Sequence, residues 1–170
     1  MGFDQSEKAI PFLDIKLEKE EIENGRNILN AIVSNNNQTI CLFTNATGTK
    51  RYSETWWNDF YGHLETAFPD HNIIELLPVE NTSQLNFKIP TYYSTDIREM
   101  GAFIANTKIF IAADNGVMHL ASAVQTPTVG LFSVTDENVY KPYNTNSLSI
   151  NTNETDHLEI VDLIRDLVAR

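Results

Sequence analysis

The sequence predicts an α/β fold in which helices wind around both faces of a parallel sheet, as in Rossmann-like domains. Helical and strand-like segments alternate along most of the 170 residues. Several expected strands are continuous apolar runs, which is typical of a sheet covered on both faces. The helices have the length of the right-handed crossovers that join parallel strands. A chain of this length forms one domain with its own core, so we expect a single domain.

Apolar residues recur at helical spacing in five segments. The expected helices span residues 17–33, 54–68, 96–107, 115–124 and 156–168. The third has Asp96 and Glu99 at the spacing of a capping box, with Asp in place of the usual Ser or Thr. These segments supply the crossover helices of the predicted fold.

Short apolar runs between the helices predict the strands. The expected strands span residues 39–43, 72–77, 91–93, 108–113, 126–132 and 147–150. Residues 78–90 lack a helical pattern, and a loop containing Pro142 is expected before the last strand.

Composition excludes several classes of function. The formal charge of −11 argues against nucleic-acid binding and against docking on anionic membranes, because both require clustered cations. No apolar run reaches 18 residues, and the first residues lack the apolar core of a signal peptide, so we expect a cytoplasmic protein. The single cysteine, Cys41, is expected to pack in the core. Cys and His spacings give no zinc motif, and no metal or cofactor is predicted.

Ligands of doubly wound folds bind outside the carboxyl ends of the strands, which selects the loops at residues 44–53, 93–96 and 113–119. The first loop combines hydroxyl side chains with Lys50 and Arg51, a composition that suits an anionic group. It lacks the frame of a Walker loop. A solvated polar turn is an equally good interpretation.

The third loop leads from a strand into a helix through Asp114, Asn115 and Gly116. Free N–H groups at a helix start attract phosphate, and glycine allows close approach. The simpler interpretation is that Asp114 or Asn115 caps the helix. His119 follows Gly116 by about one turn and faces a similar direction, although most lone helical histidines are surface or core residues.

Residues 114–136 closely resemble the signature of the heptosyltransferase-like glycosyltransferases, family 9. The matching positions are Asp114, Gly116, His119, Leu120, Ala121, Pro127, Leu131 and Phe132. A second family segment is similar to residues 44–57, where Thr44, Lys50, Tyr52 and Trp57 take the corresponding positions. The two motifs occur in the family's order, and the resemblance runs from about residue 39 to residue 142.

The resemblance implies the C-terminal, nucleotide-sugar-binding half of a two-domain GT-B fold. Such enzymes transfer a sugar, typically heptose from ADP-heptose, to lipopolysaccharide or a related glycan. By analogy, the donor-site residues are Thr44, Thr47, Lys50, Thr95, Asp114, Asn115, Gly116 and His119. Lys50, with Thr44 or Thr47, would neutralise the diphosphate, and Asp114 would bind sugar hydroxyls. The N–H groups of Asn115 and Gly116 would hold phosphate oxygens, and the loop containing Thr95 would lie beside the base.

Lys50 and Asp114 are the expected catalytic residues, since Lys50 and the helix start would stabilise the charge on the leaving diphosphate. That arrangement needs no metal. Departures from the family pattern leave the nucleotide and sugar open. Asn115 replaces Ser or Thr, and Ser133 replaces a glycine. Glu75 and Glu80 are only weak substitutes for the acid that binds the ribose in the family.

A GT-B enzyme also needs an N-terminal domain that binds the acceptor and supplies the base. We therefore expect residues 1–170 to form the donor-binding domain, with residues 1–16 as a remnant of the interdomain linker. Alone it would bind donor without turnover, and any peripheral contact with the inner membrane would come through the other domain. The alternatives are an inactive nucleotide-binding or interaction module of the same ancestry, and a related sugar-nucleotide epimerase, which the Lys50 segment disfavours.

Overall fold

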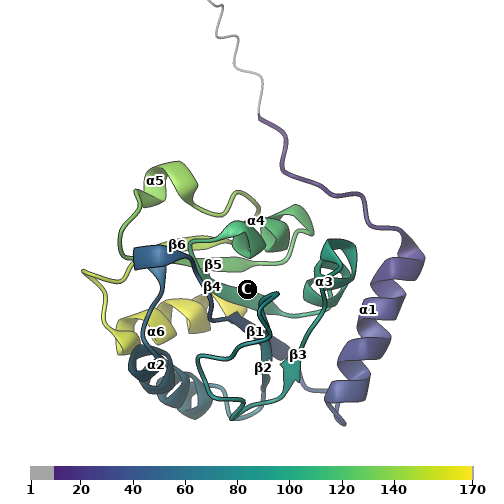
Figure 1. Cartoon of the computed structure of the whole chain (residues 1–170), viewed down its shortest axis with the longest axis horizontal. Coiled ribbons are helices and arrows are strands. Elements are labelled where there is room, and N and C mark those ends of the chain that lie inside the picture. Colours follow the sequence, from purple (N-terminus) through teal and green to yellow (C-terminus); the bar gives the residue numbers. More distant parts are fainter. Residues whose placement is uncertain (1–9, 170) are drawn as a thin grey trace, which may run out of the picture.

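The computed structural model describes residues 10–169 and contains a six-stranded sheet between two layers of helices (Figure 1). The strands are β1 (Thr39–Phe43), β2 (Asn72–Leu76), β3 (Thr91–Tyr92), β4 (Ile109–Ala113), β5 (Thr128–Phe132) and β6 (Leu148–Asn151). Their order is β3-β2-β1-β4-β5-β6, and every neighbouring pair is parallel. This is the doubly wound topology predicted from the sequence, with the reversal of strand order between β1 and β4.

The helices divide between the two faces of the sheet. They are α1 (Lys19–Ile32), α2 (Glu54–Ala67), α3 (Ile97–Ile104), α4 (Gly116–Ala123), α5 (Glu137–Tyr140) and α6 (His157–Val168), with a 3₁₀ turn η1 (Gly48–Lys50). Helices α1, α3 and α4 pack against one face, and α2 and α6 against the other (Figure 1). Successive residues of β4 alternate between the two cores, with Phe110 and Ala112 facing α3 and α4, and Ile111 facing α2 and α6. The apolar strands therefore separate two cores, as their composition indicated.

The predicted elements lie within a few residues of the observed ones, with two differences. Helix α5 falls where a plain loop was expected, because a four-residue helix is too short to show a helical period. The capping box at α3 is incomplete. Asp96 accepts hydrogen bonds from the N–H groups of Arg98 and Glu99, but the Glu99 carboxylate accepts the hydroxyl of Ser94 instead of the Asp96 N–H.

A buried carboxylate anchors the helix-free connection between β2 and β3. Glu75, at 0% exposure, accepts hydrogen bonds from the hydroxyls of Thr44 and Ser83. The Ser83 oxygen in turn accepts the N–H groups of Leu85 and Phe87. Burial raises the pKa of Glu75 above its ordinary value. One carboxylate thus ties the end of β1 to the connection that replaces a crossover helix.

A segment without regular secondary structure, residues 10–18, precedes α1 and contacts the end of α4, where the Ile15 N–H donates to the Ala123 carbonyl. We call it the extended segment. Arg98 of α3 holds it by donating to the carbonyls of Ile15 and Lys16, and the same guanidinium pairs with Glu21 at 2.6 Å. This pairing lowers the pKa of Glu21 to about 2. Of the predicted linker remnant, residues 1–9 lie outside the described residues, and the rest has no regular secondary structure.

Two features are absent from residues 10–169. None of the helices there has both the length and the apolar character needed to cross a bilayer. Within the same residues, no group of three His, Cys, Asp or Glu side chains is arranged to hold a metal ion.

Substitution of Gly25 tests the contact between α1 and α3. A Cβ at Gly25 would lie 2.3 Å from the carbonyl oxygen of Ala102, so Gly25→Ala should lower the free energy of unfolding by about 1–3 kcal/mol. Gly62, exposed in the middle of α2, has open space around it. Gly62→Ala should therefore raise the free energy of unfolding by about 1 kcal/mol through helix propensity. Urea unfolding measures both, and equal effects would contradict the close approach of α1 and α3.

The raised pKa of Glu75 predicts that the difference in stability between wild type and Glu75→Gln depends on pH. Because its folded pKa is raised, protonation of Glu75 stabilises the protein, and this contribution is lost as the pH rises through the folded pKa. The stability of wild type relative to Glu75→Gln, which carries no titrating group, should therefore rise as the pH falls from neutrality towards the ordinary glutamate pKa. Glu75→Ala should cost about 1–3 kcal/mol, because Thr44 and Ser83 lose their acceptor. Urea unfolding at several pH values checks both. If the free energies of unfolding of wild type and Glu75→Gln differed by the same amount at every pH, the raised pKa of Glu75 would be refuted.

Candidate functional site

A pocket of about 470 Å³ opens at the carboxyl ends of β1, β2 and β3, beside the start of α4. We call it the carboxyl-edge pocket. Its lining residues are Phe43, Asn45, Ala46, Thr47, Pro78, Val79, Glu80, Ser94, Thr95, Ile97, Met100, Asn115, Gly116, Val117 and Leu120. All three loops selected from the sequence contribute to this lining. The rule for doubly wound folds therefore locates the pocket correctly.

The walls of the carboxyl-edge pocket are mainly apolar. Val79 and Ile97 are well exposed, and Met100 and Leu120 complete the apolar surface. Glu80 and Thr95 supply hydrogen-bonding groups. The Asn45 Oδ1 atom is buried and has no donor within residues 10–169. An apolar slot with a few polar groups suits a planar ring that carries hydrogen-bonding edges.

The start of α4 combines a side-chain cap with an open glycine. Asn115 is the N-cap, and its Oδ1 accepts the N–H groups of Val117 and Met118. Its Nδ2 donates to the carbonyl of Asn45 at 3.1 Å, which ties the cap to the β1 loop. Gly116, the first helical residue, lines the pocket, and no atom lies within 4 Å of where its Cβ would be. The capping interpretation of Asn115 is therefore confirmed, and the positive end of the helix dipole still faces the pocket through Gly116.

Lys50 and Asp114 meet across the β1–β4 crevice. The Lys50 Nζ lies 3.2 Å from Asp114 Oδ2, with the two side chains 28% and 7% exposed. The same Asp114 oxygen accepts the hydroxyl of Thr135 at 2.7 Å. A partly exposed cation therefore stands at the point where the strand order reverses, held in place by a buried acid.

The other predicted site residues fall into two groups. Thr47 and Thr95 line the carboxyl-edge pocket beside Asn115 and Gly116. Thr44 is buried, and its hydroxyl donates to Glu75 at 2.5 Å, so it faces away from the pocket. His119 is half-buried in α4 and is not part of the lining. Of the two weak candidates for binding a ribose, Glu80 lines the pocket and Glu75 does not.

Two residues near the ion pair were not singled out as site residues from the sequence. Thr135 contacts Asp114, and Tyr52 contacts Thr152 through hydroxyls 2.8 Å apart. Burial raises the pKa of Tyr52. Thr135 follows β5, and the carboxyl-edge rule that selected three loops applies equally to the loop after this strand. That rule was the available signal for Thr135.

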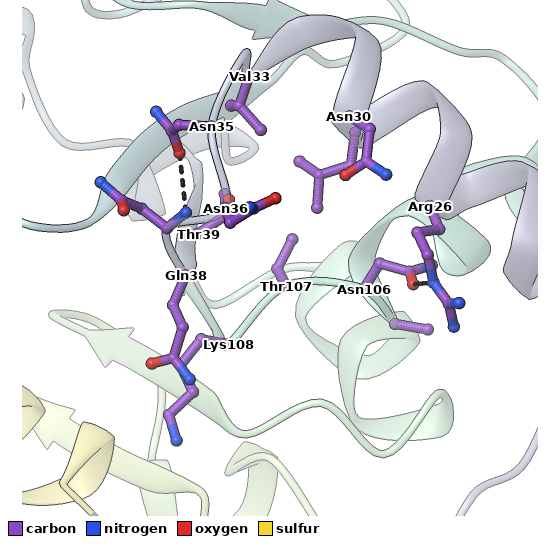
Figure 2. A pocket seen from close by; sticks show the side chains of 13 residues that line it. Arg26, Asn30, Val33, Asn35, Asn36, Gln38, Thr39, Asn106, Thr107 and Lys108 are labelled. Atoms are coloured by element: carbon purple, nitrogen blue, oxygen red, sulfur yellow. Dashed lines mark hydrogen bonds between the residues drawn. The ribbon is translucent and has the colours of Figure 1, made fainter.

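A second pocket, of about 450 Å³, lies at the amino ends of β1 and β4. Figure 2 shows Arg26 and Asn106 on one side of it, joined by a hydrogen bond of 3.4 Å, and Asn35, Asn36 and Gln38 on the other. Lys108 adds a second cation. This pocket is at the edge opposite Lys50 and Asp114. Ligands of doubly wound folds bind at the carboxyl edge, so the carboxyl-edge pocket is the candidate site.

Comparison with known sequences points to one family of enzymes. Residues 89–163 match the family model described as Glycosyltransferase family 9 (heptosyltransferase). Lipopolysaccharide heptosyltransferase 3 of Escherichia coli is 38% identical over 50 residues. That alignment covers 29% of this chain and 15% of the relative.

Solved structures share the fold. The Escherichia coli ADP-heptose lipopolysaccharide heptosyltransferase II matches with a TM-score of 0.72 and 13% identity, covering 92% of this chain and 53% of that one. A family 9 glycosyltransferase from Veillonella parvula matches with a TM-score of 0.79 and 11% identity, covering 96% and 56%. The chain thus spans about half the length of these two structures. The chain is therefore similar to glycosyltransferase family 9 in sequence over residues 89–163, and it shares the fold of the two solved structures.

Proposed function

We propose that residues 1–170 form the donor-binding domain of a glycosyltransferase that takes a sugar from a nucleoside diphosphate. The observation that carries the proposal is the arrangement at the carboxyl edge, where an apolar pocket, an open helix start and Lys50 adjoin one another. In this proposal the apolar pocket accommodates the nucleobase, the helix start binds the diphosphate, and Lys50 balances the negative charge of the diphosphate. Heptose from ADP-heptose is the favoured donor, since one relative is named for ADP-heptose and both it and the sequence relative for lipopolysaccharide.

The nucleoside would occupy the carboxyl-edge pocket. Val79, Ile97, Met100 and Leu120 offer apolar surface to the base. In this pose Glu80 accepts hydrogen bonds from the ribose hydroxyls, as its position in the lining permits.

The diphosphate would lie between Lys50 and the start of α4. Gly116 allows its oxygens to approach the helix N-terminus, where N–H groups and the dipole favour negative charge. Lys50 contributes a formal positive charge from the opposite side, and Thr47 a hydroxyl. Asp114 keeps Lys50 at the crevice while the donor is absent. In the complex, Lys50 contacts both the diphosphate and Asp114.

Sugar transfer breaks the bond between the sugar's anomeric carbon and the diphosphate oxygen, while an acceptor oxygen bonds to that carbon. Negative charge grows on the leaving diphosphate, and Lys50 with the Gly116 N–H stabilises it. The acceptor, lipopolysaccharide or a related glycan, and the base that deprotonates it belong in this proposal to an N-terminal domain. That domain would also provide any peripheral contact with the inner membrane, and the chain alone would bind donor without turning it over.

Calorimetric titration with ADP-heptose tests this assignment. Lys50→Ala should weaken binding by at least about tenfold, because a charge-assisted contact to phosphate is lost. Lys108→Ala is the matched control, since it removes one cation from the amino-edge pocket of Figure 2 and should leave binding unchanged.

Two outcomes would contradict the proposal. Loss of binding in Lys108→Ala with none in Lys50→Ala would move the site to the opposite edge of the sheet. An absence of binding to ADP-, GDP- and UDP-sugars by the wild-type chain would exclude donor binding and favour the inactive interaction module instead.

A further inference from the structure

The amino-edge pocket, at the amino ends of β1 and β4, takes no part in the proposed donor site. It lies at the edge of the sheet opposite Lys50 and Asp114, and Figure 2 shows its lining. Its volume of about 450 Å³ falls within the roughly 300–1,000 Å³ that is typical of small-molecule sites. The pocket is therefore large enough for a ligand of its own.

Amide side chains dominate the lining of the amino-edge pocket. Among its lining residues within residues 10–169 there is no Asp or Glu, although the chain has 23 of these acids against 12 Lys and Arg. Amides both donate and accept hydrogen bonds, so this lining suits a ligand that carries several hydroxyl groups. The amide residues of the lining are Asn30, Asn35, Asn36, Asn37, Gln38 and Asn106.

Hydrogen bonds fix the backbone of the loop that carries Asn36. The side chains of Asn35 and Asn72 bond to each other in both directions, at 3.0 and 2.8 Å. Asn72 Nδ2 also donates to the carbonyl of Asn37 at 3.1 Å. The Asn36 side chain lies across the pocket from α1 in Figure 2 and has no hydrogen-bond partner in the described part of the chain. The loop thus presents an available amide on a fixed backbone, which lowers the entropy cost of binding.

Asn106 positions a cation at one end of the amino-edge pocket. Its Nδ2 donates to the carbonyls of Ile22 and Ala102, each at 2.8 Å, and its Oδ1 accepts the Nε of Arg26 at 3.4 Å (Figure 2). Within residues 10–169, Arg26 pairs with no carboxylate. The terminal nitrogens of its guanidinium are therefore available to an anionic ligand.

Lys108 supplies a second cation to the amino-edge pocket. Figure 2 shows it at the end of the pocket where Gln38 lies, away from Arg26. It is half-buried, and it too forms no ion pair with the residues that the structure describes. An ammonium group that is partly removed from water is stabilised by an anion beside it.

The helix ends at the amino-edge pocket reduce its positive charge without cancelling it. Val33 and Ala105, the C-caps of α1 and α3, both line the pocket. Each helix C-terminus contributes roughly half a negative charge, so the two ends offset about one of the two cations. About one positive charge remains, which favours a ligand with one anionic group over a neutral ligand.

We propose that the amino-edge pocket binds a hydroxylated ligand of about one sugar ring that carries one anionic group, either a phosphate monoester or a carboxylate. Arg26 offers paired N–H donors to the anionic group, and the amides bind the ring hydroxyls. Leu29 and Val33, both buried, provide apolar surface for the carbon atoms of the ring. This site is independent of donor binding at the carboxyl edge and goes beyond the proposed function.

Nuclear magnetic resonance of the isotope-labelled chain tests the proposal with four probes. The probes are glucose-6-phosphate, glucuronate, glucose and inorganic phosphate. The side-chain amide signals of Asn30 and Asn36 should shift and saturate with the two anionic sugars. Glucose and inorganic phosphate should bind at least about tenfold more weakly, because each lacks one of the two kinds of contact. The tighter of the two anionic sugars identifies the anionic group that the pocket prefers.

Variants test which cation binds the ligand. Arg26→Gln should weaken binding of the anionic sugars by at least about tenfold, the loss expected for a charge-assisted contact, and Lys108→Gln should weaken it in the same direction. Lys19→Gln is the matched control, because Lys19 is exposed on α1, the same helix as Arg26, and does not line the pocket. It should leave binding unchanged. An otherwise unchanged backbone spectrum shows that each variant is folded.

Four results would overturn the proposal. An absence of shifts with both anionic sugars would exclude the site. Equal affinity for glucose would show that the cations play no part, and equal affinity for inorganic phosphate would leave an anion site without a sugar. Equal weakening by Lys19→Gln and Arg26→Gln would reduce the effect to general attraction between charges.

Discussion

The parallel pairing of β1 with β4 is the constraint on which the rest of the structure depends. It joins two halves of the sheet whose crossovers run in opposite directions, so the chain leaves β1 and β4 towards opposite faces. No crossover covers the crevice between the two strand ends. Lys50 lies in the loop after β1, and Asp114 directly follows β4. Their ion pair spans this crevice. The carboxyl-edge pocket takes its position from the ends of β1, β2 and β3 on one side of this pair.

At the carboxyl edge, packing positions the strand ends and charge determines which ligand groups they can bind. The two cores hold the strands so that successive residues commit to opposite faces, which leaves only the strand ends free for ligand contacts. There the chain places Lys50, which is partly exposed and paired with Asp114, in a protein with a formal charge of −11. In the proposed complex, Lys50 and the start of α4 hold the diphosphate.

The sequence predicts most of the fold because its strands are short apolar runs and its helices are amphipathic. Helix α5 escaped prediction, since four residues carry no period. The sequence also predicts which loops meet at the candidate site, because strand direction alone brings them together. It does not predict the direction of single side chains. Thr44 and Thr47 are both hydroxyl residues of one loop, and only the structure separates them, because the Thr44 side chain is committed to the buried Glu75.

Arg98 connects α3 to the extended segment and to α1. Its guanidinium donates hydrogen bonds to the carbonyls of Ile15 and Lys16 in the extended segment, and it pairs with Glu21 of α1. Its backbone belongs to the first turn of α3, next to Ile97, which forms a wall of the carboxyl-edge pocket. Arg98 therefore ties the extended segment to the helix turn that carries this wall, and Gln125, just after α4, holds the same segment at the carbonyl of Leu13.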